Sequence, residues 1–186
     1  MAAHPPAPPA GYRIRAREAA DDAALLRIEN RAAQLFRHCG YRALADAPLA
    51  DVAALRCLFA GNRVWVAAAD DGAPAGFAVA GPLQRFLHLC ELSVDPAHGR
   101  RGVGAALVRA VLASAPDHGC DGVSLTTFRF VPFNRPFYER LGFVELPLDA
   151  APPALRAVFD RELPQGVDAK ERLLMVCGTA AAARSR

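Results

Sequence analysis

Hydrophobic and polar positions follow two different periods along this chain of 186 residues. Residues 12–17 alternate apolar and charged side chains, which predicts a half-buried strand. In the next segment Leu25, Ile28, Ala32 and Leu35 recur at helical spacing, and Asp21 and Asp22 precede them as candidate helix caps. Apolar runs predict further strands at 63–69, 76–80, 87–94, 123–128 and 172–177, with another beginning at Gly142-Phe143. Further helices are predicted at about 51–59, 105–115 and 135–141, and within 149–162.

The order of these elements predicts an α/β fold, with a mixed, mainly antiparallel sheet flanked by helices in a single domain. Asp70-Asp71-Gly72 is typical of a hairpin turn between two of the strands. A chain of this length can bury a substantial core. We expect residues 1–10 to form a disordered lead-in, residues 11–178 to form one domain, and residues 179–186 to form a frayed tail.

Charge and cysteine usage narrow the class of partner. The formal net charge is only +3, and the arginines are spread along the chain, whereas a nucleic-acid-binding surface needs clustered basic residues. No apolar run reaches the roughly 18 residues needed to cross a bilayer, and residues 1–9 do not resemble a signal peptide. The five cysteines stand singly without metal-ligand spacing, which indicates free thiols and no metal site. We therefore expect a cytoplasmic protein with no nucleic-acid or membrane partner.

A glycine- and arginine-rich loop, residues 98–104, separates the strand at 87–94 from the helix that follows. Its glycines, Gly99, Gly102 and Gly104, let the backbone turn tightly and let a ligand approach closely. The first N–H groups of a helix lack intrahelical partners and favour an anion, above all a phosphate. The spacing matches neither the Walker A loop nor the dinucleotide-binding fingerprint. A phosphate cradle and a glycine-rich turn without a ligand are both open from spacing alone.

A second motif, Tyr138-Glu139-Arg140-Leu141-Gly142-Phe143, sets a tyrosine four residues before Gly-Phe. Together, the loop and this motif resemble the acetyl-CoA signature and the late tyrosine motif of the GNAT superfamily of N-acetyltransferases. The resemblance covers about residues 12–146 in element order and is specific over 87–143. It implies that Gly102 and Gly104 fill the two small-residue positions of the signature. Gly99 stands where Arg or Gln is usual, and Arg100 supplies the charge one residue later.

The resemblance also implies a binding site for acetyl-CoA as the cosubstrate. Ser93 and Val94, at the strand end, would pair through their backbone with the pantetheine arm. Family members often carry an asparagine at the start of the late helix; Asn134 has a similar position, and alternatively it is only the N-cap of that helix. The pyrophosphate would be held in the loop that starts at Gly99, by the amides of Arg100, Arg101, Gly102, Val103, Gly104 and Ala105.

Two side chains are candidates for the proton transfers that acetylation of an amine requires. Tyr138 can donate a proton to the departing thiolate, because a phenol has a pKa of about 10; alternatively it is a packed aromatic beside Phe137 and Phe143. Glu91, an acidic residue in an apolar strand, can take the proton of the amine, directly or through water; alternatively it forms a salt bridge with an arginine.

The other polar residues of these strands have plainer interpretations. His88 is expected to be a hydrogen-bonded core histidine, and Cys90 and Cys120 to be small core residues. His98 borders the loop and is a candidate phosphate contact.

The sequence as a whole predicts an acetyl-CoA-dependent N-acetyltransferase that acts on a primary amine by direct attack. The acceptor is a small molecule or a protein, and the chain is a possible homodimer through its final strand. One alternative is a CoA-sensing module with the same fold and no catalysis. Another is a protein that uses the loop for a different nucleotide.

Overall fold

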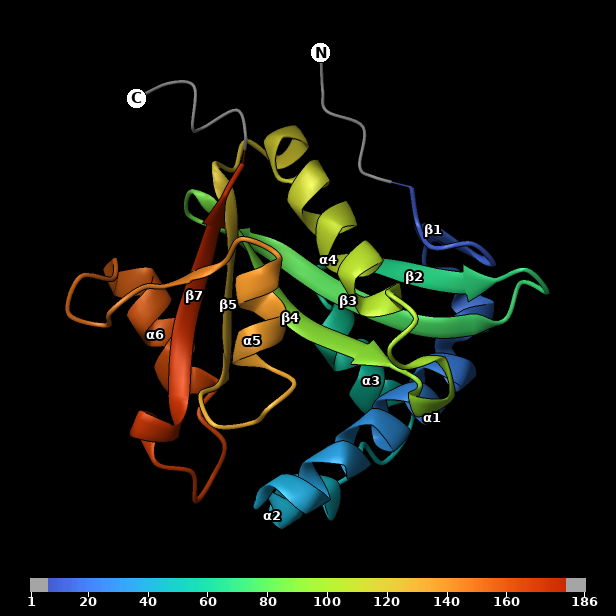
Figure 1. Cartoon of the computed structure of the whole chain (residues 1–186), viewed down its shortest axis with the longest axis horizontal. Coiled ribbons are helices and arrows are strands. Elements are labelled where there is room, and N and C mark those ends of the chain that lie inside the picture. The colour runs from blue at the N-terminus through green and yellow to red at the C-terminus, as the bar shows by residue number, and fades with distance from the viewer. Residues whose placement is uncertain (1–6, 180–186) are drawn as a thin grey trace. The chain divides into compact units, whose positions relative to one another are not determined.

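The computed structural model describes residues 7–179 of the chain. Strands and α-helices follow one another in this described part (Figure 1) as β1 (Tyr12–Ala16), α1 (Asp22–Ala33), α2 (Arg42–Ala45), α3 (Val52–Phe59), β2 (Arg63–Ala69), β3 (Pro74–Leu83), β4 (Phe86–Val94), α4 (Val103–Ser114), β5 (Gly122–Phe128), α5 (Arg135–Arg140), β6 (Val144–Glu145), α6 (Pro153–Arg161) and β7 (Arg172–Gly178).

The strands form a seven-stranded sheet in the order β1-β2-β3-β4-β5-β7-β6. β1 pairs antiparallel with β2, and β2 pairs antiparallel with β3. β4 pairs in parallel with β5, joining Phe86–Leu89 to Gly122–Leu125. β7 is antiparallel to both of its neighbours, β5 and β6. The sheet is mixed and mainly antiparallel, so the predicted α/β fold class is confirmed.

Contacts within the chain divide it into two compact units. Unit 1 comprises residues 1–81 and 90–111, and unit 2 comprises residues 82–89 and 112–186. All three boundaries cut continuous elements, because β3 changes unit after Gly81, β4 after Leu89 and α4 after Val111. The single domain that the sequence predicts over 11–178 stays a prediction, and each unit is described by itself.

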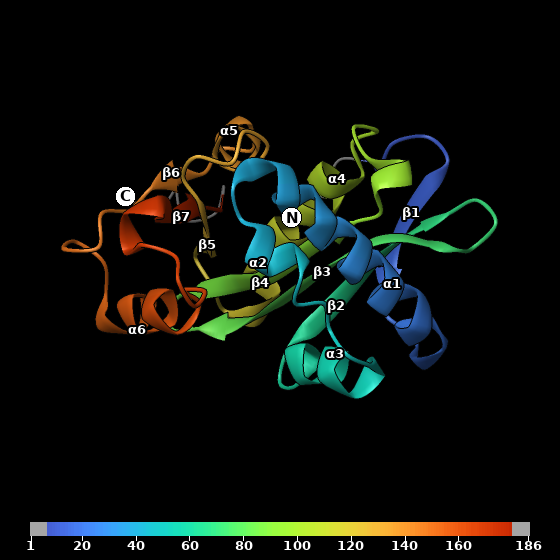
Figure 2. The same ribbon diagram turned by 90° about the horizontal axis from the view of Figure 1, so that it is seen from below.

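The core of unit 1 forms where two helices cover one face of β2 and β3. Leu25 and Ile28 of α1 meet Leu55 and Phe59 of α3 in a buried cluster that also includes Val64, Val66, Phe77 and Val79. α4 lies across the opposite face of these strands (Figures 1 and 2). Each fully buried side chain of this size contributes about 1.5–3 kcal/mol. The two layers of helix hold the strands from both sides.

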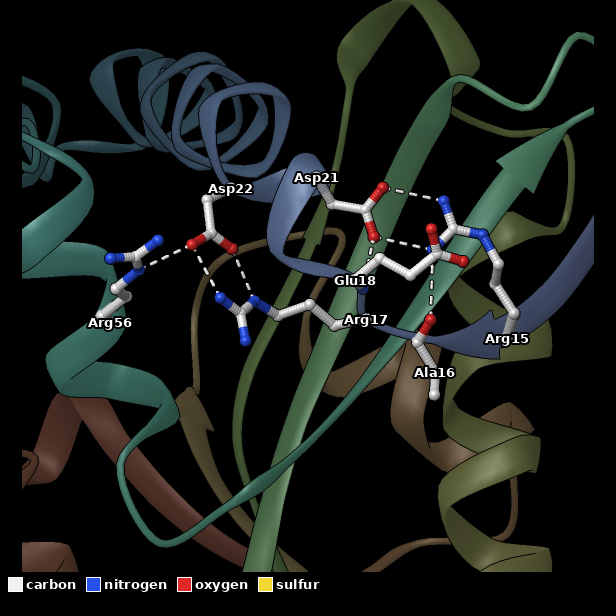
Figure 3. A network of polar contacts seen from close by, with 7 residues as sticks. All are labelled: Arg15, Ala16, Arg17, Glu18, Asp21, Asp22 and Arg56. Carbon is white, nitrogen blue, oxygen red and sulfur yellow. Dashed lines mark hydrogen bonds and ion pairs between the residues drawn. The ribbon is translucent and has the colours of Figure 1, made fainter.

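Buried ion pairs fix the turn between β1 and α1 (Figure 3). Asp21 accepts two hydrogen bonds from Arg15, at 2.6 and 2.8 Å. Asp22 accepts two from Arg17, at 2.5 and 2.6 Å, and one from Arg56 of α3 at 2.7 Å. The hydrogen bonds from Arg15 and Arg17 lower the pKa of the two carboxyls below the ordinary value, despite their burial. The prediction that these side chains cap the helix is wrong. Both carboxylates accept hydrogen bonds from guanidinium groups, and the Asp21 side chain makes no cap hydrogen bond to α1.

In unit 2, β7 lies between β5 and β6 and is the central strand of the group. Leu155 and Phe159 of α6 pack on Leu174 of β7, together with Ala151. α5 and α6 lie on opposite faces of β5 and β7 (Figures 1 and 2). A side chain at Gly122 of β5 would overlap the carbonyl oxygen of Cys177 in β7, so this close strand approach requires glycine.

Several boundaries differ from the sequence predictions. The 3₁₀ turn Gln34–Cys39 and the short helix α2 were not predicted. β6 begins at Val144 and not at Gly142, because the chain turns at Gly142 with φ 90° and then buries Phe143. Within residues 7–179, no helix is long and apolar enough to cross a membrane. Of the lead-in predicted over residues 1–10 and the tail predicted over 179–186, residues 1–6 and 180–186 lie outside the described residues.

Candidate active site

The loop after β4 leads into the N-terminus of α4, within unit 1. The N–H of Asp95 donates to the carbonyl of Ala75 in β3 at 2.9 Å, which fixes the end of β4. α4 begins at Val103, two residues earlier than predicted. Its Ala106 N–H donates to the carbonyl of Gly102 at 3.0 Å. The amides of residues 103–105 therefore form the first helical turn, whose N–H groups precede that i→i−4 bond.

The backbone of the loop is left-handed at Arg100, with φ 57°, and again at Gly102, with φ 83°. Gly99, by contrast, has φ −62°, which any residue adopts. A Cβ at Gly99 would nevertheless lie 3.1 Å from the carbonyl oxygen of Pro96, a tight contact. Gly99 therefore stands one residue before the first left-handed position. Arg100 occupies that position, in a backbone conformation that glycine adopts more easily than arginine does.

The charges and dipoles of this loop favour a phosphate. The side chains of Arg100 and Arg101 are exposed, so their guanidinium groups can contact a ligand in solution. Left-handed residues within a turn direct successive N–H groups toward one side, which makes an anion-binding concavity. The positive end of the α4 dipole adds to this attraction. His98, the other candidate for a phosphate contact, is hydrogen-bonded through Nδ1 to the Tyr12 hydroxyl at 2.8 Å.

Glu91 lies on β4 with its carboxylate held by neighbours on the same strand. Its Oε1 accepts from the backbone N–H of Leu92 and from the Ser93 hydroxyl, each at 3.0 Å. The predicted common face of Glu91 and Ser93 is thereby confirmed. Ser93 is itself buried, so the Glu91 side chain has a fixed partner.

Tyr138 belongs to unit 2, on the short helix α5. Its ring makes edge-to-face contacts with Phe137 and Phe143, at centroid distances of 5.0 and 5.7 Å. The side chain is only half-buried, so these contacts orient the ring without enclosing it. Asn134 stands at the N-cap position of α5, but its side chain makes no cap hydrogen bond. Its carbonyl instead accepts from the N–H groups of Phe137 and Tyr138 at 3.0 and 3.1 Å.

His88 lies in a buried polar network of unit 2. Its Nδ1 meets the Ser124 hydroxyl at 2.9 Å and its Nε2 meets Glu162 Oε1 at 3.1 Å. Thr126 donates to the other oxygen of Glu162 at 2.7 Å. Burial tends to raise the pKa of Glu162, but the bonds from His88 and Thr126, with the charges of His88 and Arg172, lower it overall. The prediction of a hydrogen-bonded core histidine is confirmed.

The two cysteines that were predicted to be core residues differ. Cys120 is buried, with an exposed fraction of 4%, and burial raises the pKa of its thiol. Cys90 is exposed on β4, so the prediction for it is wrong. The alternation of a strand places Cys90 and Glu91 on opposite faces, and the apolar sequence around Cys90 does not reveal which face meets solvent.

Sequence reasoning missed Glu29 of α1, whose carboxyl has an unusual environment. Burial and, second, the charge of Glu91 raise its pKa to about 7. A signal was present in the sequence, because Glu29 stands four residues after Leu25, on the apolar stripe of the helix. An acidic residue on such a stripe is costly unless something compensates for it.

The predicted site residues fall into two groups. Unit 1 brings together Glu91, Ser93, Val94 and the loop from Gly99 to Ala105, which follow one another along β4 and into α4. Unit 2 holds Asn134 and Tyr138, one helical turn apart on α5.

Residues 24–143 match the Acetyltransferase (GNAT) family. Solved structures of similar fold include PaiA N-acetyltransferase from Thermoplasma acidophilum in complex with coenzyme A, which is 15% identical with a TM-score of 0.69 over 90% of this chain and 98% of that chain. A GCN5-related N-acetyltransferase from Rhodopseudomonas palustris is 18% identical, with a TM-score of 0.68 over 91% and 97%. The ribosomal-protein-S18-alanine N-acetyltransferase from Escherichia coli is 18% identical, with a TM-score of 0.63 over 90% and 93%. The family match spans more than half of the chain, and this chain therefore belongs to the GNAT family of acetyltransferases.

Proposed function

We propose that this protein transfers the acetyl group of acetyl-CoA to a primary amine by direct attack of the amine on the thioester. The observation that carries the proposal is the passage from β4 through the left-handed loop into the N-terminus of α4. This arrangement combines exposed arginines, turn amides and a helix dipole at one place, and all three favour a phosphate. The match of residues 24–143 to an acetyltransferase family supports the same cosubstrate.

Binding of acetyl-CoA is assigned to unit 1. The amides of residues 100–105 are proposed to hold the pyrophosphate, with Arg100 and Arg101 contributing charge at its rim. The backbone of Ser93 and Val94 is proposed to pair with the pantetheine arm. Acetyl-CoA supplies an activated acyl group, and the protein contributes position and proton transfer.

The nitrogen loses two protons, and the departing sulfur gains one, as the bonds are exchanged. An amine in water at neutral pH is mostly an ammonium ion, so it must lose a proton before its nitrogen can attack. Glu91 is proposed to accept that proton, as its carboxylate is held by Leu92 and Ser93. A carbon–nitrogen bond then forms and the carbon–sulfur bond breaks. Tyr138 is proposed to donate a proton to the departing thiolate, and the phenolate takes up the second proton that the nitrogen loses as the amide forms. Glu91 then returns its own proton to solvent.

Removal of the phenol hydroxyl tests the role of Tyr138. In Tyr138→Phe, we expect kcat to fall at least about tenfold, because general acid catalysis by one positioned group contributes that much or more. The ring contacts with Phe137 and Phe143 do not need the hydroxyl, so the affinity for CoA measured by calorimetry should remain within about twofold. Unchanged turnover with a panel of amines would contradict the assignment.

The reaction itself is tested by incubating the wild-type chain with acetyl-CoA and a panel of primary amines and detecting acetylated amine by mass spectrometry. We expect at least one acetylated product, formed in step with free CoA. Calorimetric binding of CoA without any acetylated product would instead favour a CoA-sensing module. Stabilisation by ATP or NAD, but not by CoA, would favour a different nucleotide.

A further inference from the structure

A cavity of about 320 Å³ lies in unit 2, beside the first residues of β7. Its walls come from the chain just after β5, from residues 145–148, from α6 and from the segment 169–174. This volume is at the lower end of the range for small-molecule sites. At roughly 30 Å³ for each atom, the cavity accommodates about ten non-hydrogen atoms. None of the residues proposed to bind acetyl-CoA or to transfer a proton lines it.

The floor of this cavity is apolar and continues the core of unit 2. Phe159 of α6 and Leu174 of β7 belong to the buried cluster of that core, and Leu146 and Leu148 pack against it. These two leucines remain partly exposed and line the cavity. Removal of such apolar surface from water is favourable. The floor therefore favours a ligand with an apolar body.

Two of the three cations that line the cavity are each joined to a carboxylate of the protein. Arg129 donates to both oxygens of Glu145, at 3.0 and 2.6 Å. Arg172 donates to the Thr126 hydroxyl at 2.5 Å, and that hydroxyl donates to Glu162 at 2.7 Å. The positive charge of each arginine is thereby offset by a negative charge within unit 2.

Lys170 supplies the third cation, and its charge is not offset in this way. Within residues 7–179 its ammonium group has no hydrogen bond or ion pair, because the polar contacts of Lys170 are made by its backbone. The adjacent carboxylates of Asp168 and Glu171 accept hydrogen bonds from backbone N–H groups of the same turn, at 2.8 and 3.2 Å, and neither residue lines the cavity. Among the described residues, the cavity therefore carries one positive charge that no direct contact neutralises.

We propose that this cavity is a binding site for a small organic carboxylate, whose apolar body covers the leucine floor and whose negative charge pairs with Lys170. A single unmatched positive charge favours a monoanion over a dianion. An ammonium ligand is disfavoured, because it would lie beside three cations. A neutral molecule of the same shape gains the apolar contact but lacks the ion pair. The site consists of other residues than the proposed acetyl transfer uses, and it does not depend on that function.

The test uses the fact that Lys170 is the only lysine of the chain. Reductive methylation with isotopically labelled formaldehyde keeps its charge and labels it together with the N-terminal amine. The Lys170 signal in the NMR spectrum is identified by its loss in Lys170→Gln. Titration of the full chain with phenylacetate should shift this signal to saturation, with a Kd of about 1 mM or tighter.

Two further ligands separate the contributions of charge and apolar contact. Phenylacetamide, the neutral isostere of phenylacetate, should bind at least about threefold more weakly, because it lacks the ion pair. Acetate, which keeps the charge and lacks the ring, should bind at least about tenfold more weakly, because it leaves the leucine floor in water.

Lys170→Gln should weaken the binding of phenylacetate at least about threefold and leave that of phenylacetamide within about twofold. Both affinities are measured from the backbone amide shifts of the lining residues. Arg161→Gln is the matched control, because it removes a positive charge from an exposed side chain of α6 that does not line the cavity. It should change neither affinity.

Shifts confined to the lining residues, with this ranking of ligands, would support the site. Acetate as effective as phenylacetate would show only an exposed cation and would overturn the proposal. Equal binding of phenylacetate and phenylacetamide, equal effects of Lys170→Gln and Arg161→Gln, or no saturation below about 20 mM phenylacetate would each overturn it as well. All of these results would leave acetyl transfer untouched, because no residue assigned to that reaction is altered.

Discussion

Arg100 and Glu29 are single residues that each violate an ordinary rule of protein structure. Arg100 has a left-handed backbone without being glycine, and Glu29 buries a carboxylate oxygen without a partner among the described residues. Departures of this kind persist in natural proteins chiefly where function requires them. Both residues lie in unit 1 with Glu91.

Replacing Arg100 with glycine should separate stability from ligand binding. We expect Arg100→Gly to raise the free energy of unfolding by up to about 1 kcal/mol, because the left-handed backbone costs an L-residue more than glycine loses in entropy. Affinity for CoA should nevertheless fall severalfold, with a smaller loss at high salt, since an exposed charge near a phosphate is screened. Urea denaturation and calorimetry at two salt concentrations measure the two effects.

Arg101→Gly is the matched control for this change. It removes the same charge from the next residue, whose φ is not positive, so glycine should lower stability by roughly 0.5–1 kcal/mol there. If both variants shifted stability in the same direction, the strain assigned to Arg100 would be wrong.

At the scale of the element, the start of α1 is stabilised by ion pairs more than by caps. Asp22 is buried, with a side chain only 4% exposed, and Arg17 and Arg56 both donate to it. Because Arg17 belongs to the chain just after β1 and Arg56 belongs to α3, Asp22 ties the start of α1 to two other segments of unit 1. Loss of this carboxylate removes the hydrogen-bond acceptor of the partly buried Arg17 and of the exposed Arg56.

We expect Asp22→Asn to lower the free energy of unfolding at pH 7 by about 3 kcal/mol, because removing one member of a buried pair leaves the other uncompensated. Asp46→Asn, which disrupts the exposed pair with Arg37, should cost less than about 1 kcal/mol. Equal losses in urea denaturation would contradict a special role for Asp22.

The pH dependence follows from the same pairs. The pKa of Asp22 in the folded chain lies below its ordinary value of 3.8, so the carboxylate contributes stability above that value and loses it as the pH falls through the folded pKa. Wild-type stability should therefore decline below about pH 4. In Asp22→Asn this decline should be shallower.

The periodic spacing of apolar residues predicted the long helices and strands. It did not predict the ion pairs or the short turns, which follow no regular spacing. Leu25, Ile28, Leu55 and Phe59 fall on apolar stripes that the sequence displays, and all four are in the core of unit 1. Asp21 and Asp22 have the positions of caps, but the sequence does not show that Arg15, Arg17 and Arg56 lie within hydrogen-bonding distance. The short turns at 34–39 and 42–45 are too brief for a helical period to be detected.

The candidate site was predicted to a similar extent. Glycine spacing identified the loop that enters α4, and strand alternation identified the shared face of Glu91 and Ser93. The left-handed conformation at Arg100 is set by how β4 and α4 are joined, which no residue pattern encodes. The raised pKa of Glu29 depends on burial and on the charge of Glu91, and both arise only from the tertiary fold.

At the scale of the whole molecule, the two units share secondary-structure elements. β4 and α4 each run through a boundary between units, so the loss of either element disrupts the hydrogen bonds of both units. We therefore expect the chain to unfold in one cooperative transition. Trp65, the only tryptophan of the sequence, lies in β2 of unit 1, whereas circular dichroism in the far ultraviolet reports on both units.

The two signals should give the same urea midpoint. Tryptophan fluorescence that changes at a lower or higher urea concentration than circular dichroism would contradict a single transition. It would also contradict the single domain expected for residues 11–178.

The exposed thiols of Cys57 and Cys90 affect how turnover can be followed in practice. Acetyl transfer liberates the thiol of CoA, and coloured disulfide reagents can follow such a release continuously. Those reagents also react with accessible protein thiols. A bulky adduct on Cys90, the residue before Glu91, would distort the strand that carries the proposed base. The reagent would then inactivate the protein during the assay, and the curved progress curves would resemble product inhibition. Quenched samples analysed for acetylated amine avoid this effect.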